Sequence, residues 1–169
     1  MTPWPDATGV ITLPGGSTVR GRSLRHAAGC PAEFTLMLAP APVPPWTHRR
    51  LRWPDFWVPL DHRDALDALA EVLERSRRGE RVEVGCAGGI GRTGTALAAL
   101  AILDVPADSP ARFPAGHGGD GAPRAAGTVG RAVAWVRTVH HPRAVETPWQ
   151  RWWLRRVAAD VANGGPPRV

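Results

Sequence analysis

The sequence predicts an α/β sandwich in which a small mixed β-sheet is flanked by helices within a single domain. Three observations lead to this prediction. Strand-like segments lie early in the chain and helix-like segments late. At residues 82–100 a β-branched strand passes through a glycine-rich turn into an alanine- and leucine-rich helix. The chain has 169 residues, enough for one core without disulfides or metal ions.

The expected strands are short runs of apolar and β-branched residues bounded by glycine or proline. The first two form a hairpin around the turn Pro14-Gly15-Gly16. The aromatic segment at 53–59 contains two prolines, which argue against regular structure, so we predict a loop there. The predicted strands are residues 9–13, 17–20, 33–39 and 81–84.

The expected helices follow from apolar residues at helical spacing. One begins at Asp61 and ends before Gly79, and the last opens at Thr147-Pro148, a good N-cap followed by proline at the first helical position. The others are predicted at 93–103 and 128–140. The residues expected to point inward are Leu66, Leu69, Ala70 and Leu73, then Val129, Ala132, Val133 and Val136, then Trp153, Leu154, Val157, Ala158 and Val161.

We predict one domain, residues 1–169, with a flexible insertion at residues 105–127. This segment is too rich in glycine, proline and alanine to pack by itself. Its start lies a full helix away from the glycine-rich turn, so we expect a neutral surface insertion. We do not interpret its histidine and aspartate as a metal site.

Composition restricts the cellular context and the partners. The formal net charge is +6, and the basic residues are all arginine, which suits steering of anionic substrates. The two cysteines, Cys30 and Cys86, with no secretion signal, predict free thiols in the cytoplasm. No apolar run is long enough for a membrane span, and no aromatic-basic alternation predicts nucleic-acid binding. No metal or cofactor is expected.

The glycine-rich turn permits two interpretations. Residues 89–94 fit the dinucleotide pattern GxGxxG, while Cys86 and Arg92 fit a phosphate site built around a thiolate. A cysteine at a helix N-terminus lies among backbone N–H groups that favour negative charge, which are conditions that favour a thiolate. The amides that would surround a phosphate belong to Ala87, Gly88, Gly89, Ile90, Gly91 and Arg92.

Four side chains complete the second interpretation. Arg92 would hold two phosphoryl oxygens at once, and Thr93 would either place its hydroxyl against the sulfur or cap the helix. Asp55, among bulky aromatic residues, is the candidate general acid. Gln150 would either orient a water molecule or complete a capping box with Thr147.

These motifs resemble those of the cysteine-dependent protein tyrosine phosphatases, which include dual-specificity phosphatases. Trp-Pro-Asp ending at Asp55, the loop from Cys86 to Arg92, and VETPWQ ending at Gln150 occur in the family's order. The resemblance implies a phosphatase fold and a two-step reaction. Cys86 attacks phosphorus, Asp55 protonates the leaving group, and water oriented by Gln150 hydrolyses the cysteinyl-phosphate. The implied partner is a phosphorylated protein or peptide.

Three positions depart from the family pattern. Gly85 stands where a histidine usually precedes the cysteine. The chain has no tyrosine to contact the substrate's ring, which leaves Trp57 or another aromatic residue for that contact. Glu146 replaces the first glutamine of the family's QTxxQ pattern, and its carboxylate either repels a phosphate or faces solvent.

The sequence is also consistent with two alternative functions. A phosphopeptide-binding module without turnover would share the fold and the site. An NAD-binding oxidoreductase would use the GxGxxG pattern, but it needs an acidic residue about 20 positions further on, which falls in the insertion, and a second strand-helix-strand repeat. The sequence leaves open the preference between phosphotyrosine and phosphoserine, and the oligomeric state.

Overall fold

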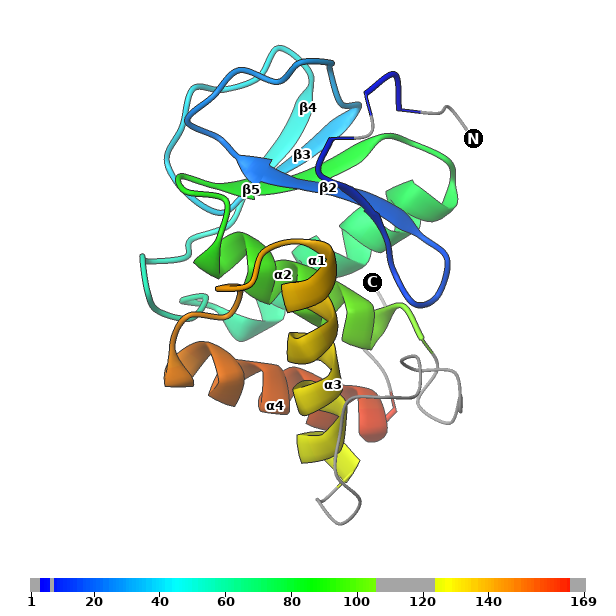
Figure 1. The fold of residues 1–169 in the computed structure, drawn as a ribbon, viewed down its shortest axis with the longest axis vertical. Coiled ribbons are helices and arrows are strands. Elements are labelled where there is room, and N and C mark those ends of the chain that lie inside the picture. The colour runs from blue at the N-terminus through cyan, green and yellow to red at the C-terminus, as the bar shows by residue number, and fades with distance from the viewer. Residues whose placement is uncertain (1–3, 7, 106–123, 165–169) are drawn as a thin grey trace.

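The computed structural model describes residues 4–6, 8–105 and 124–164. In this part of the chain five strands form one sheet, and there are four helices. Figure 1 shows the helices on one side of the sheet. In spatial order the strands are β1 (Val10–Thr12), β2 (Thr18–Ser23), β5 (Val82–Cys86), β3 (Phe34–Met37) and β4 (Thr47–Arg50). This arrangement confirms the predicted α/β class with a small mixed sheet.

The sheet is antiparallel at one edge and parallel elsewhere. Strands β1 and β2 pair antiparallel, as predicted for the hairpin, while the β2–β5, β5–β3 and β3–β4 pairs are parallel. Parallel strands end at the same edge, so the carboxyl ends of β2 and β5 bring Ser23 beside Cys86. In open α/β sheets this edge is where ligands bind.

The helices are α1 (His62–Arg77), α2 (Gly91–Leu103), α3 (Arg124–Val139) and α4 (Pro148–Ala162). Asp61 caps α1 by accepting a hydrogen bond from the Asp64 N–H at 3.0 Å, and Thr147 caps α4 with proline at the next position. These caps confirm the predicted starts of both helices, because each side-chain oxygen satisfies an N–H group that the helix itself leaves free.

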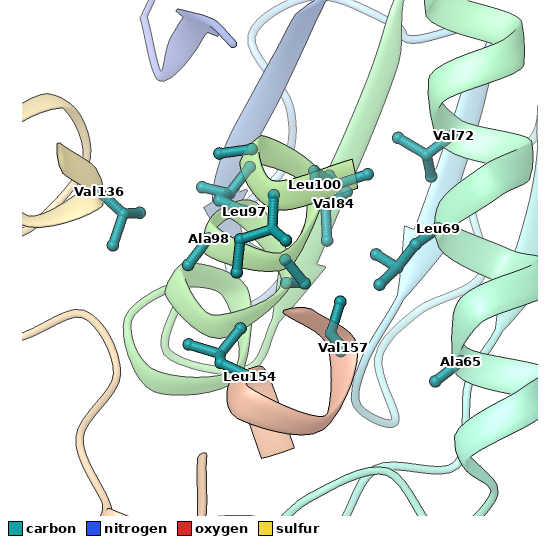
Figure 2. Packing of buried hydrophobic residues seen from close by; sticks show 14 of the residues in the cluster. Ala65, Leu69, Val72, Val84, Leu97, Ala98, Leu100, Val136, Leu154 and Val157 are labelled. Atoms are coloured by element: carbon teal, nitrogen blue, oxygen red, sulfur yellow. The ribbon is translucent and has the colours of Figure 1, made fainter. Parts of the chain in front are cut away.

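Helix α2 is the centre of the hydrophobic core. It packs against the sheet on one side and against α3 and α4 on the other (Figure 1), and twelve of its thirteen residues are buried. Figure 2 shows side chains of the surrounding elements pointing at it, among them Leu69, Val84, Val136 and Leu154. An apolar helix that is enclosed on all sides has a fixed position, so its N-terminus is a rigid platform for a site.

The opposite face of β5 carries a buried carboxylate. Glu83 is fully buried and accepts hydrogen bonds from Arg20, Arg22 and Thr35. Burial alone raises the pKa of this carboxyl. The hydrogen bonds from Arg22, Thr35 and Arg20 outweigh burial and hold the pKa below its ordinary value. The charge is therefore compensated, and the cluster ties β2, β3 and β5 together.

Three details of the prediction differ from the structure. The strand β4 was missed because its sequence Thr-His-Arg-Arg is polar and largely exposed at the sheet edge, without an apolar alternation. Residues 124–127, predicted to be part of the insertion, begin α3 instead. Residues 106–123 lie outside the described residues, so the rest of the insertion stays a prediction. Ala70 is half-buried, whereas the other residues predicted to point inward are buried.

Candidate active site

The segment that joins β5 to α2, residues 86–92, is called the phosphate loop here. Cys86 ends β5 and is buried, and its Sγ accepts a hydrogen bond from the Gly89 N–H at 3.2 Å. Ile90 takes the N-cap position of α2 without a side-chain hydrogen bond. The first N–H groups of α2 therefore have no intrahelical or side-chain cap acceptor, and together with the helix dipole they favour an anion next to the sulfur.

Thr93 joins the two ends of the phosphate loop. Its Oγ1 accepts a hydrogen bond from the Cys86 N–H at 2.9 Å, and both residues are buried. Because the oxygen serves as the acceptor, the hydroxyl proton is free to be donated elsewhere. The contact holds Cys86 against the first turn of α2.

The guanidinium of Arg92 is anchored on one side and available on the other. Its Nη1 donates to the carbonyl oxygens of Leu38 at 3.2 Å and Trp53 at 3.0 Å. Its Nη2 lies 3.1 Å from Oδ1 of Asp55, and its buried Nε has no hydrogen-bond partner among the described residues. A buried donor without a partner is costly, so the Nε–Nη2 edge is suited to bind two oxygens of an anion.

The acid loop, residues 53–57, is held by a buried tryptophan. Trp53 packs against Trp153 with ring centroids 5.1 Å apart, and its Nε1 donates to the Trp57 carbonyl at 2.8 Å. Asp55 has a side chain that is 66% exposed, in contrast to Arg92 at 7%. Phe56 adopts a positive φ of 54°, a conformation that is uncommon for a bulky residue. The loop thus holds the exposed Asp55 carboxylate in contact with the buried guanidinium of Arg92.

An aromatic pair connects the acid loop to α4. Trp57, the residue predicted to contact a substrate ring, lies 5.4 Å from Trp149 between ring centroids. Both tryptophans are about half exposed. Trp149 was not singled out from the sequence, because it lies far from the acid loop along the chain and only the position of α4 brings the two rings together.

Gln150 is fully buried and forms the capping box that the sequence allowed. Its Oε1 accepts hydrogen bonds from the N–H groups of Glu146 at 2.8 Å and Thr147 at 3.3 Å. Its Nε2 has no hydrogen-bond partner among the residues that are described. Two roles were considered for Gln150, and the structure contains the helix cap. The unpartnered Nε2 leaves a donor for the other role, which is to orient a water molecule.

Glu146 borders the phosphate loop, although the residue is exposed. Its Oε2 packs so closely on Gly91 that a Cβ at this position would collide with it. The preceding residue, Val145, has a positive φ of 60°, which is strained for a β-branched side chain. The carboxylate therefore lies beside the phosphate loop and is also exposed to solvent, and its repulsion of a bound phosphate stays a prediction.

A side chain at the position before the cysteine would require Leu24 to move. A Cβ on Gly85 would lie 2.6 Å from side-chain atoms of Leu24. Two residues that the sequence analysis missed contact the phosphate loop instead. Ser23 Oγ donates to the Ala87 carbonyl at 2.6 Å, and His140 Nε2 bonds to the Gly89 carbonyl at 2.8 Å. They lie 64 and 51 positions away from these carbonyls along the chain, so no local sequence signal could indicate them.

The described residues contain no candidates for two other kinds of site. No group of three or more His, Cys, Asp or Glu side chains there could hold a metal ion. Within the same residues no helix has the length and apolar character needed to cross a membrane.

Comparisons with known proteins bear on the family and the fold. The family model of protein-tyrosine phosphatases matches residues 45–111, a segment that contains Asp55, Cys86 and Arg92 but not Gln150. The chain is similar to the crystal structure of Tk-PTP in the active form, at 21% identity and a TM-score of 0.61, over 93% of this chain and 99% of that chain.

The chain is also similar to the Yvh1 phosphatase domain from Chaetomium thermophilum, at 22% identity and a TM-score of 0.56, over 74% of this chain and 77% of that domain. At these identities the likeness establishes the fold. The fold is therefore one that known phosphatases share. The family-model match over residues 45–111 confirms the resemblance to the protein tyrosine phosphatases that the sequence predicts.

Proposed function

We propose that this chain is a cysteine-dependent phosphoric monoester hydrolase that acts on phosphorylated proteins or peptides. One observation carries the proposal, the arrangement of Cys86, Arg92 and Asp55 at the carboxyl edge of the sheet. Cys86 Sγ accepts an amide hydrogen bond, and Arg92 bonds to Asp55 while its Nε stays unpartnered among the described residues. A phosphoryl group supplies the oxygens that this arrangement lacks.

The first step forms a cysteinyl-phosphate. The Cys86 thiolate attacks phosphorus, the bond between phosphorus and the leaving oxygen breaks, and Asp55 gives its proton to that oxygen. Arg92 holds two of the remaining oxygens through Nε and Nη2, and the amides of the phosphate loop stabilise their charge. Asp55 Oδ1 lies 3.1 Å from Arg92 Nη2 in the structure, so the carboxyl is within reach of a group bound to Arg92.

The second step releases inorganic phosphate. A water molecule attacks phosphorus, the bond between sulfur and phosphorus breaks, and Asp55 takes a proton from the water. The Thr93 oxygen accepts the Cys86 N–H, which places the hydroxyl next to Cys86. In this step the hydroxyl donates a hydrogen bond to the departing sulfur. Gln150 orients the water through its unpartnered Nε2, while its Oε1 keeps the helix cap.

The aromatic surroundings favour aryl phosphates such as phosphotyrosine. Trp57 and Trp149 form a half-exposed pair beside the acid loop, where a substrate ring can pack against them. The phosphate loop carries the uncharged side chains Ala87 and Ile90, which do not favour polyanionic headgroups. We therefore rank a phosphoprotein above a phosphorylated lipid as the substrate. Apart from the substrate and water, the proposed reaction uses only side chains and amides of this chain.

An aryl phosphate assay tests the proposal. Wild-type protein should hydrolyse the substrate in the presence of chelator, vanadate should inhibit it, and Cys86→Ser should abolish turnover while leaving the thermal unfolding temperature similar. Rapid mixing should give a burst of phenol that equals the enzyme concentration if the cysteinyl-phosphate breaks down slowly. Wild type that binds vanadate without hydrolysis from pH 5 to 8 would instead identify a phosphopeptide-binding module.

A further inference from the structure

Two carbonyl groups of the phosphate loop are held by residues outside it. The Ser23 hydroxyl donates to the Ala87 carbonyl at 2.6 Å, and His140 Nε2 lies 2.8 Å from the Gly89 carbonyl. A carbonyl oxygen only accepts hydrogen bonds, so the His140 ring must carry a proton on Nε2. Ser23 comes from the end of β2, and His140 directly follows α3.

These contacts determine where the neighbouring amides point. A trans peptide unit is planar, and its C=O and N–H groups point in opposite directions. The Ala87 carbonyl shares a peptide with the Gly88 N–H, and the Gly89 carbonyl shares one with the Ile90 N–H. Because both carbonyls point outward to Ser23 and His140, both N–H groups point toward the interior of the loop. The interior is also where the Gly89 N–H meets Cys86 Sγ.

The His140 ring is fixed in this position by close packing. It lies against β2, where a Cβ on Gly21 would be 3.0 Å from the ring's Cε1. Burial lowers the pKa of His140 below its ordinary value, the hydrogen bond to Gly89 opposes this, and the neighbouring His141 adds to the lowering. The ring is therefore neutral at neutral pH, a state in which Nε2 donates while Nδ1 carries no proton.

We propose that Ser23 and His140 are positioning residues for phosphate binding: they hold the Ala87 and Gly89 carbonyls outward and thereby direct the Gly88 and Ile90 amides at the phosphoryl oxygens. Glycines at 88 and 89 make the peptides of this loop easy to rotate, so an external constraint has a large effect on where their amides point. Gly85 leaves no side chain before Cys86 to provide such a constraint. The inference rests on the proposed function, because it assigns the amides to a phosphoryl ligand.

The test compares oxyanion binding with stability. Tungstate affinity is measured by calorimetry, and thermal unfolding is followed without tungstate, for Ser23→Ala, His140→Leu and His140→Gln. Leucine fills a similar volume without a donor, whereas the glutamine amide restores one. His141→Leu is the matched control, since the His141 ring accepts the Arg143 N–H rather than contacting the loop.

We expect Ser23→Ala and His140→Leu each to weaken tungstate binding about fivefold to tenfold, the range of one lost hydrogen bond. His140→Gln should recover most of this loss, and His141→Leu should bind like wild type. For an aryl phosphate, KM and kcat should both be affected, because the same amides hold the ground state and the transition state. Ser23→Ala removes a single oxygen atom, so it decides the question even if the His140 variants do not fold.

Unchanged tungstate affinity in Ser23→Ala and His140→Leu overturns the inference, whatever their stability. If tungstate affinity falls in His140→Leu and His140→Gln does not restore it, the hydrogen-bond donor has no role. The effect of His140 is then one of packing alone. Wild type that binds tungstate but shows no turnover overturns the proposed function, and the tungstate affinities of the variants still decide the positioning role.

Discussion

The replacement Gly89→Ala tests the shape of the phosphate loop most directly. Gly89 has a φ of 73°, in the left-handed region where a side chain is strained. An added Cβ would lie 2.5 Å from the backbone nitrogen of Ser23, and a backbone atom cannot move aside without moving the end of β2. Gly88, one position earlier, is exposed, and a Cβ added there would have no heavy atom within 4 Å.

The expected size of the effect follows from the surroundings of Gly89 and Gly88. A left-handed conformation costs an alanine about 1–2 kcal/mol, and the collision with Ser23 brings the total strain to about 1–3 kcal/mol. If the loop keeps its shape, this cost lowers the free energy of unfolding. If the loop changes shape to avoid the strain, kcat/KM for an aryl phosphate falls by about 5-fold to 150-fold, at 1.36 kcal/mol per tenfold. Gly88→Ala should change stability by less than about 0.5 kcal/mol.

Both variants are measured by urea unfolding and by initial rates with an aryl phosphate, together with tungstate affinity. For each variant, the loss in the free energy of unfolding is added to the loss in kcat/KM expressed as a free energy. This sum should be clearly larger for Gly89→Ala than for Gly88→Ala. Equal behaviour of the two variants, or a Gly89→Ala protein with the stability and turnover of wild type, would refute the loop geometry described above.

Three further predictions concern charged groups near the site and in the core. Glu146→Gln should tighten tungstate binding about fivefold, because like charges a few ångströms apart in water repel by about 1 kcal/mol; weaker binding would contradict this. Asp55→Asn should slow phosphotyrosine hydrolysis about 10²- to 10⁴-fold but an activated ester much less, measured as a leaving-group series; equal losses would remove Asp55 as the acid. Glu83→Gln should lower the free energy of unfolding by about 3–5 kcal/mol at pH 7, since two arginines lose a buried partner. Folding lowers the pKa of Glu83, so its contribution is present above the unfolded value of about 4.3 and is lost as the pH falls through the folded value. In urea unfolding at several pH values, the difference from wild type should therefore narrow below about pH 4, and a constant difference would contradict the assignment.

Local patterns in the sequence determined much of the fold. The apolar spacing after Asp61, the proline after Thr147 and the glycine turn after Pro14 each predicted an element that the structure contains. These signals are local, because a cap, a turn or an amphipathic face depends on residues within a few positions of each other. The polar strand β4 carried no such pattern, since it becomes a strand only by pairing with β3.

The sequence by itself also determined the chemical groups of the candidate site. Cys86 and Arg92 lie on one strand-loop-helix unit, so their spacing alone brings them together, and Trp-Pro-Asp identified the candidate acid. Only the tertiary structure decided that Arg92 anchors to the Leu38 and Trp53 carbonyls and that His140 supports the Gly89 carbonyl. These contacts join segments dozens of positions apart, and their partners are backbone carbonyls, which every residue type possesses. Side-chain identity therefore specifies what reacts, whereas packing around α2 specifies where it is held.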